Sequence, residues 1–275
     1  MENFQLTLLF KIMGFGSASG LVYEDDKLFI ISDSSAYLYE YQMLDKKLEK
    51  IALTENAQDS IPKKDKLDLE AITRKGNDLV LLGSGSTDKR NRLFTYNRQT
   101  KKISESDFTA MYEKIKSQLQ IKDDELNIEG LVITDKAHYF FQRGNGITSK
   151  NGIICVEEKA SKQLFRFMPY ELTTIKNVAA TFTDAVLVDD KLYFLACAED
   201  TNSTFHDGAI MGSIVGSIDL HSMKLEFTQQ ISYIHKFEGI TLYKKSKSEI
   251  TFLLCEDNDT DVLESDIYRL TLKVV

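Results

Sequence analysis

A short phrase recurs five times along the chain, and its spacing constrains the fold more than any other feature. Each copy has a polar residue, then a small residue, then apolar residues that suit a strand. The polar residues of the five copies are Ser19, Glu70, Glu129, Asp184 and Glu238. They are 51, 59, 55 and 54 residues apart. Repeats of roughly this length, about 40–50 residues plus loops, are typical of β-propeller blades.

The segment after each copy also repeats, as a polar turn that leads into a run of β-branched and aromatic residues. Asp25-Asp26 precedes the run 28–31, and Asp189-Asp190 precedes the run 192–195. This pattern predicts a hairpin between the first two strands of each unit. We therefore predict an all-β fold, a five-bladed β-propeller formed by residues 1–275 as a single domain.

Two segments do not fit the five repeats. Residues 4–12 resemble an extra strand, whereas the last blade has only three obvious strands. A propeller must close its ring to avoid a bare sheet edge, so we expect residues 4–12 to pair with residues 266–274. Residues 104–121 instead carry apolar side chains at helical spacing, which predicts one inserted helix near residues 107–120. We expect residues 163–177 to connect blades three and four through an irregular strand and a helical turn.

Composition narrows the function classes. Lys and Arg total 34 and Asp and Glu total 42, and a net charge of −8 argues against binding a nucleic-acid polymer. No apolar run of about 18 residues is present, so we expect no membrane-spanning helix and no membrane partner. The N-terminus lacks signal-peptide features, which favours a cytoplasmic location; a removed leader would be compatible with a periplasmic or secreted one. The three cysteines lack CxxC spacing, and we expect them to be buried and reduced.

The repeated polar residues predict a metal site. The innermost strand of each blade lines the axis of a propeller, so Ser19, Glu70, Glu129, Asp184 and Glu238 should meet there. Four carboxylates in a dry channel need a counter-charge or must be protonated. An all-oxygen ligand set suits Ca²⁺, with Mg²⁺ as the alternative. The competing interpretation is that each carboxylate forms a hydrogen bond to the backbone of the next blade and so holds adjacent blades together.

Further polar residues should surround a funnel above this ring, because the second strand of each blade ends on the same face. We predict catalytic roles for three carboxylates there: Asp33, Glu199 and Asp257. We predict ligand-binding roles for Ser84, Arg90, Arg143, Asn145 and Asp200. The loop 83–92 has the composition of an anion-binding nest, although a flexible hairpin tip has the same composition. Arg143 is either an anion contact or a salt-bridge partner of a neighbouring blade.

The order Ser19, Glu70, Glu129, Asp184, Glu238 resembles the central ligand set of five-bladed calcium-activated nucleotidases, the animal apyrases. That resemblance implies one Ca²⁺ held by inner-strand Ser and Glu side chains. The chain departs from that family at Asp184, where the family has a serine, and in having no Trp. The Asp-Leu-Glu-Ala phrase at residues 68–71 is also similar to bacterial phytase-like esterase propellers and to bacterial propellers of unknown function.

Two hypotheses about function follow. In the first, the chain is a calcium-dependent hydrolase of phosphoester or phosphoanhydride substrates that binds a small anionic or phosphorylated ligand. In the second, it is a non-catalytic, calcium-stabilised propeller that presents its funnel to a partner. No HExxH, nucleophile-elbow or Rossmann motif supports a metalloprotease, serine hydrolase or dehydrogenase.

Overall fold

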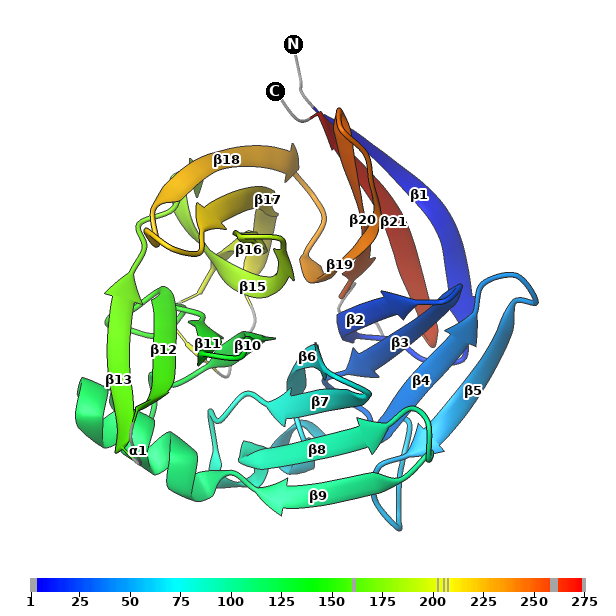
Figure 1. Ribbon diagram of the computed structural model, residues 1–275, viewed down its shortest axis with the longest axis horizontal. Helices are drawn as coiled ribbons and strands as arrows, with labels where there is room; N and C mark the ends of the chain where they lie inside the picture. The colour runs from blue at the N-terminus through cyan, green and yellow to red at the C-terminus, as the bar shows by residue number, and fades with distance from the viewer. Residues whose placement is uncertain are drawn as a thin grey trace.

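The fold is a five-bladed β-propeller, as predicted. The computed structural model describes residues 4–159, 162–201, 203, 204, 206, 208–257 and 262–273. Five antiparallel sheets stand around a central axis (Figure 1). Blade one contains β2 (Ala18–Glu24), β3 (Lys27–Ser32), β4 (Tyr37–Gln42) and β5 (Lys47–Ala52). Blade two contains β6 (Leu69–Lys75), β7 (Asp78–Gly83), β8 (Arg92–Asn97) and β9 (Ile103–Asp107).

The other three blades repeat this order from the axis outward. Blade three contains β10 (Ile128–Ile133), β11 (Ala137–Gln142), β12 (Gly152–Lys159) and β13 (Lys162–Pro169). Blade four contains β15 (Val178–Val188), β16 (Lys191–Asp200), β17 (Ala209–Asp219) and β18 (Leu225–Ser232), with the short β14 (Thr174–Ile175) beside β15. Blade five contains β19 (Phe237–Lys245), β20 (Glu249–Glu256), β21 (Glu264–Lys273) and β1 (Phe4–Met13).

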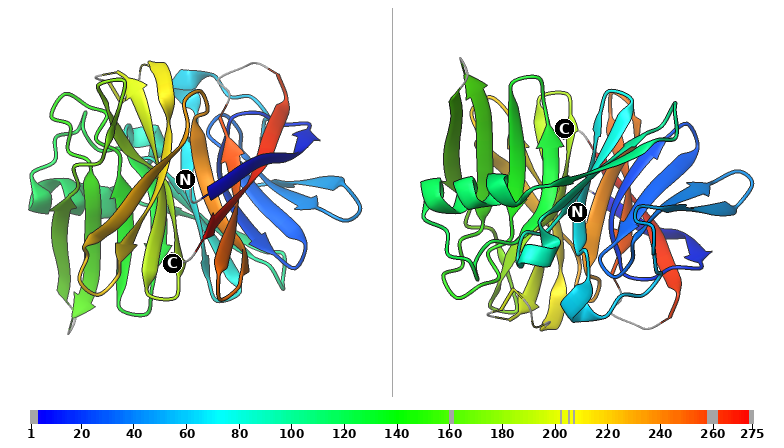
Figure 2. Two further views of the ribbon diagram at one scale, coloured as in Figure 1. Left: turned by 90° about the horizontal axis from the view of Figure 1, so that it is seen from above. Right: turned by 90° about the horizontal axis from the view of Figure 1, so that it is seen from below.

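The N-terminal strand closes the ring. β1 pairs antiparallel with β21, from Phe4 opposite Leu272 to Met13 opposite Glu264. The two strands lie side by side in every view, although they come from opposite ends of the chain (Figures 1 and 2). The predicted pairing of residues 4–12 with 266–274 is therefore confirmed for the residues that the structure describes.

Local chemistry explains the hairpins, and packing between blades explains the core. Asp25 and Asp26 join β2 to β3 with φ of 50° and 59°. Two positive φ values are those of a type I′ turn, whose twist matches the flanking strands. Apolar side chains of adjacent sheets then interdigitate; Leu21 and Tyr39 of blade one pack in the same cluster as Ile267 of blade five.

The predicted helix is present between blades two and three. α1 (Thr109–Leu119) lies outside the sheets, near β13 (Figure 1). It buries Tyr112 and Ile115 in a cluster that also contains side chains of both blades. The Tyr112 hydroxyl donates to the carbonyl of Gly83, which ties the helix to the end of β7.

The prediction of an irregular connection between blades three and four is corrected by the structure. β13 is a regular eight-residue outer strand that pairs along β12, whereas we expected an irregular connection over residues 163–177. The three cysteines are buried and unpaired, as expected. Among the described residues, no helix is long and apolar enough to cross a membrane.

Candidate functional site

A one-residue β-bulge recurs in all five inner strands and selects the residue aimed at the axis. The register between the first and second strand of each blade shifts across a single residue: Ser19, Glu70, Glu129, Thr183 and Glu238. Bulges re-aim a side chain and are common beside functional sites. Four of the five predicted repeat positions are therefore confirmed as equivalent.

The bulge in blade four corrects the fifth position. It falls on Thr183, so Asp184 occupies the position that Gly130 and Gly239 hold in other blades. Asp184 lies against the next blade: its Oδ2 accepts from the backbone N–H of Ile240 at 2.8 Å, and its Oδ1 accepts from Ala185 at 2.7 Å. For Asp184, the structure therefore shows the alternative to a metal ligand, a hydrogen bond that joins two adjacent blades.

Ser19 also connects blades. Its hydroxyl donates to the carbonyl of Leu69, directly before Glu70, and the Thr183 hydroxyl donates to the carbonyl of Phe237, directly before Glu238. The two bonds are equivalent, since each runs from one bulge to the inner strand of the next blade. Ser19 and Asp184 are both buried, and neither forms the wall of the central cavity that the three bulge glutamates line.

In blades one, two, three and five a small residue follows the bulge residue, at a place where the axis is crowded. A Cβ atom built on Gly239 would lie 2.5 Å from the Cys255 Sγ and 2.9 Å from the Cα of Gly20. Both distances are too short for atoms in contact, so the inner strands of blades five and one approach each other only because these positions lack side chains.

A cavity of about 630 Å³ opens at the ends of the second strands. Its volume is in the usual range for small-molecule sites. Three positions in the blade repeat supply much of its polar wall: the bulge residue, the residue two before it, and the residue after the second strand. Below the bulges, the inner strands continue with the buried apolar residues Leu21, Ile72, Leu131 and Ile240. These side chains lie beneath the polar wall, toward the opposite face.

Arg143 is the centre of a buried charge network. Its guanidinium pairs with Glu199 of blade four, with Glu129 at 3.2 Å and with Glu238 of blade five at 3.6 Å. Each of these four side chains is only 5% exposed. Three carboxylates raise the pKa of Arg143 well above its usual value, although burial opposes them. Of the two roles left open for Arg143, the structure shows the ion pairs with neighbouring blades.

Lys236 extends the network toward blade one. Its ammonium group lies 3.0 Å from Glu238 and 3.2 Å from Asp257. Burial, which the negative charge of Asp257 reinforces, raises the pKa of Glu238 well above its usual value, while the Lys236 ammonium opposes the shift. Burial also raises the pKa of Glu129, against the positive charges of Arg143 and Lys236.

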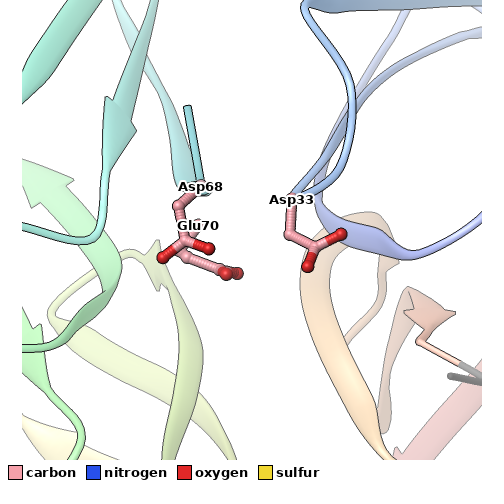
Figure 3. Close-up of side chains that lie close together, drawn as sticks. All are labelled: Asp33, Asp68 and Glu70. Carbon is pink, nitrogen blue, oxygen red and sulfur yellow. The ribbon is translucent and has the colours of Figure 1, made fainter. Parts of the chain in front are cut away.

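A second cluster joins blades one and two on the other side of the cavity. Asp33 follows β3, while Asp68 and Glu70 begin blade two. One oxygen from each carboxylate lies within 4.8 Å of the other two. Figure 3 shows Asp68 and Glu70 facing Asp33 across the gap between the blades. Asp68 has a left-handed backbone, φ 53°, which is strained for a residue other than glycine.

The partners of this cluster leave acceptor oxygens available. Lys66 pairs with Asp33 Oδ2, and Arg90 donates to Asp68 Oδ2 at 2.8 Å. The buried Asp33 Oδ1 has no hydrogen-bond partner in the described part of the chain. The Glu70 carboxylate likewise forms no hydrogen bond or ion pair with any described residue. It is enclosed by protein yet partly open to the cavity.

Burial and like charges raise the free energy of the folded state when all three carboxylates of this cluster are ionised. Burial raises the pKa of Asp33 to about 6, and the negative charge of Asp257 adds to the effect against Lys66. Burial also raises the pKa of Glu70 well above its usual value, and the charges of Glu129 and Asp68 add to it. Carboxylates in this state favour either a proton or a bound cation.

Comparison with known proteins gives a family and a fold. The model of a family of unknown function, DUF6929, matches residues 14–272. The chain belongs to this family. A search of curated protein sequences gives no significant match to this DUF6929 protein.

Solved structures confirm the propeller architecture. Glutaminyl cyclase from Myxococcus xanthus aligns with a TM-score of 0.55 and 10% identity, over 98% of this chain and 97% of that one. The major Malassezia sympodialis allergen Mala s 1 aligns with a TM-score of 0.51 and 7% identity, over 98% and 96%. A luciferin-regenerating enzyme aligns over 94% and 92%, with 11% identity and a TM-score of 0.46. At these identities the likeness concerns the fold alone.

Most residues predicted for the funnel of the DUF6929 protein do lie at the cavity. Its wall contains Asp33, Glu70, Arg90, Glu129, Arg143, Asn145, Glu199, Glu238 and Asp257. Ser84 is buried behind the wall and donates to Asp68 Oδ2. Asp200 is exposed and is not among the described residues of the wall. In the loop 83–92, Arg90 is only 4% exposed and pairs with Asp68, so this part of the loop is packed.

Sequence reasoning missed several residues of the wall, among them Asp68, Asn127 and Lys236. Each of these three precedes a bulge glutamate by two positions, in the phrases Asp-Leu-Glu, Asn-Ile-Glu and Lys-Phe-Glu. Residues two apart on a strand point to the same face. The signal was therefore present, because a polar side chain at that position faces the same way as the glutamate.

Proposed function

We propose that this DUF6929 protein binds a divalent cation, Ca²⁺ in preference to Mg²⁺, at Asp33, Asp68 and Glu70. The observation that carries the proposal is the convergence of three carboxylates, of which Glu70 and one oxygen of Asp33 have no hydrogen-bond partner among the described residues. Two oxygens bound to one Ca²⁺ lie at most about 5 Å apart, twice the bond length. The separation of up to 4.8 Å fits that limit. Ca²⁺ takes about six to eight oxygens in a flexible geometry, whereas Mg²⁺ demands a near-ideal octahedron, and this favours Ca²⁺ at three carboxylates from two blades.

The surrounding charges support a cation at this place and not elsewhere in the cavity. Glu129, Glu199 and Glu238 already have Arg143, and Glu238 and Asp257 have Lys236. Glu70 is the bulge glutamate without such a partner among the described residues. A divalent ion would supply the missing charge, and Lys66 and Arg90 would orient the other two carboxylates as outer partners.

We further propose that the cavity binds a small phosphorylated ligand and hydrolyses its ester. When bound, the cation would hold phosphate oxygens and neutralise their charge. Of the three predicted catalytic carboxylates, Asp33 belongs to the cation cluster. Both oxygens of Glu199 are engaged, by Arg143 and by the backbone N–H of Gly208. We propose Asp257, on the cavity wall beside Lys236, as the group that accepts a proton from the attacking water.

The proposed hydrolysis needs only the phosphate ester and water as reactants. The water oxygen forms a bond to phosphorus while its proton passes to Asp257, and the ester P–O bond breaks. The leaving oxygen takes a proton from cavity water, and Asp257 returns its own to solvent. Lys236, 3.2 Å from Asp257, would hold the carboxylate in place.

Isothermal titration with CaCl₂ tests the cation site. We expect wild-type protein to bind one Ca²⁺ and Glu70→Gln to bind it roughly tenfold or more weakly, because the charge of the ligand set controls affinity. Glu249→Gln is the matched control, since Glu249 is exposed at the start of β20. Absence of Ca²⁺ binding by the wild type would overturn the cation site, and equal binding by Glu70→Gln would overturn its assignment.

Phosphate release tests the reaction separately. Calcium-loaded protein is incubated with p-nitrophenyl phosphate, a sugar phosphate and a nucleotide, beside Asp257→Asn. We expect release by the wild type and its loss in the variant, with Ca²⁺ affinity unchanged. Calcium binding without turnover of any substrate would favour the alternative function, a calcium-stabilised propeller that binds a partner.

A further inference from the structure

We propose that the organic part of the ligand is small and polyhydroxylated, as in a sugar phosphate, and is not a nucleoside. The proposal rests on the proposed cation-dependent phosphate site and names its substrate class. The observation that carries it is an oriented hydrogen-bond acceptor on the wall next to the cation cluster, together with the absence of Phe and Tyr from the described residues of the wall.

Asn127 supplies the acceptor. It lies in the cavity wall, is 4% exposed, and comes two residues before the Glu129 bulge. Its Nδ2 donates to Glu129 Oε1 at 2.7 Å and to Asn145 Oδ1 at 3.3 Å, so both amide protons are used. The carboxylate fixes the orientation of the amide, because an ionised carboxylate only accepts.

The opposite atom of this amide has no partner. No described residue donates a hydrogen bond to Asn127 Oδ1, although the side chain is buried. This oxygen can therefore accept a hydrogen bond from a ligand. A ligand hydroxyl on the cavity side would satisfy it, whereas a phosphate oxygen, which has no proton to donate at neutral pH, would not.

The rest of the wall suits hydroxyl groups as well. Its charged residues are mostly carboxylates that already have a cationic partner, and these can still accept from a ligand O–H. Asn145 supplies an N–H donor nearby, so a hydroxyl can both donate and accept. Several neighbouring hydroxyls on a small ring could each bond to an acceptor and a donor of the wall. A single alcohol group would use only one such pair.

The described part of the wall offers a nucleobase no large aromatic side chain to stack on. No Phe or Tyr is among the described residues of the wall, and the chain has no Trp. The ring that does occur there is the imidazole of the exposed His206. Large aromatic side chains such as Tyr39 and Phe237 are buried within the blades. Bases gain affinity by stacking on aromatic side chains, and a nucleotide would gain little of it from the described residues of the wall.

Titration of calcium-loaded protein with three probes tests the inference: glucose 6-phosphate, adenosine 5′-monophosphate and inorganic phosphate. We expect glucose 6-phosphate to bind roughly tenfold more tightly than either of the others, the effect of one or two well-made hydrogen bonds. If the protein turns over the esters, the same order is read from kcat/KM. Adenosine monophosphate equal to or better than glucose 6-phosphate overturns the inference, as does failure of all three to bind.

The Asn127→Ala variant assigns the effect to one atom. We expect its affinity for glucose 6-phosphate to fall to that for inorganic phosphate, with affinities for Ca²⁺ and phosphate unchanged. Asn97→Ala is the matched control, because Asn97 bonds to Asp78 at the other end of blade two. The wild-type comparison decides the matter even if Asn127→Ala does not fold. Glucose 6-phosphate binding that needs Asn127 but not Ca²⁺ would refute the cation site and leave this inference standing.

Discussion

A single bulged residue in each inner strand determines what the axis of this propeller contains. Where it is Ser19 or Thr183, the side-chain hydroxyl donates a hydrogen bond to the backbone of the next blade. Where it is glutamate, the side chain is too long for that bond and reaches the cavity. Two of the three glutamates have Arg143 as a partner and Glu70 has none among the described residues, so similar residues at equivalent positions differ in charge environment.

The raised pKa values predict an unusual pH dependence for cation-free protein. The folded state raises the pKa of Asp33 to about 6, and those of Glu70 and Glu238 go up as well. A carboxyl whose pKa is raised by folding binds its proton more tightly in the folded state. The free energy of unfolding in chelator should therefore rise, not fall, as pH is lowered from 7 to 5. Asp33 alone would contribute on the order of 1–3 kcal/mol.

Thermal melts at pH 7.5, 6.0 and 5.0 check this expectation. With saturating Ca²⁺ the trend should vanish or reverse, because protons and cation then compete for the same oxygens. A melting temperature that falls steadily from pH 7.5 to 5.0 in chelator would show that these carboxylates are not strained in the folded state.

Asp184 gives a prediction that separates its two interpretations. Asp184→Ala leaves the buried N–H of Ile240 without an acceptor, which should lower the free energy of unfolding by about 1–3 kcal/mol. Asp184→Asn keeps an acceptor oxygen and should cost less. Urea unfolding measures both. Calcium affinity should be unchanged in both variants; a large loss in Asp184→Asn would restore Asp184 as a metal ligand.

At the level of elements, β1 is the strand on which ring closure depends. It covers β21 over most of its length, and without it β21 would present unpaired N–H and C=O groups. Deletion of residues 1–13 should therefore yield protein that is destabilised and self-associates. The soluble fraction, the melting temperature and size-exclusion chromatography report the effect.

The matched control for this deletion is a substitution on the same strand. Leu8 is 49% exposed, so Leu8→Ser should change stability by less than about 0.5 kcal/mol. A deletion variant that remains monomeric and melts like the wild type would mean that the β1–β21 pairing adds little to closure.

At the scale of the whole molecule, Arg143 joins blades three, four and five through one side chain. Arg143→Met would leave Glu129, Glu199 and Glu238 buried without this counter-charge. Removing one partner of a buried ion pair costs about 3–5 kcal/mol. Urea unfolding should show a loss of that order. Arg166→Met is the control, since Arg166 pairs with Glu157 at the surface and should cost at most about 1 kcal/mol. Similar losses in both variants would contradict the role of Arg143.

The sequence by itself determined the number of blades, the closing strand, the inserted helix and three glutamates at the axis. These depend on local periodicity and on the repeat, which the folded chain must satisfy blade by blade. Asp68, Asn127 and Lys236 were also within reach, because a two-residue spacing places them on the face of the bulge glutamates.

Only the tertiary structure decided which carboxylate oxygens at the cavity have no partner among the described residues. The bulge in blade four falls on Thr183 and not on Asp184, because register depends on pairing with β16 and not on the phrase alone. Asp33 meets Asp68 and Glu70 across a blade boundary, and Arg143 is occupied by carboxylates from two other blades. Such distances between blades depend on how whole sheets pack around the axis, which no spacing within one blade encodes.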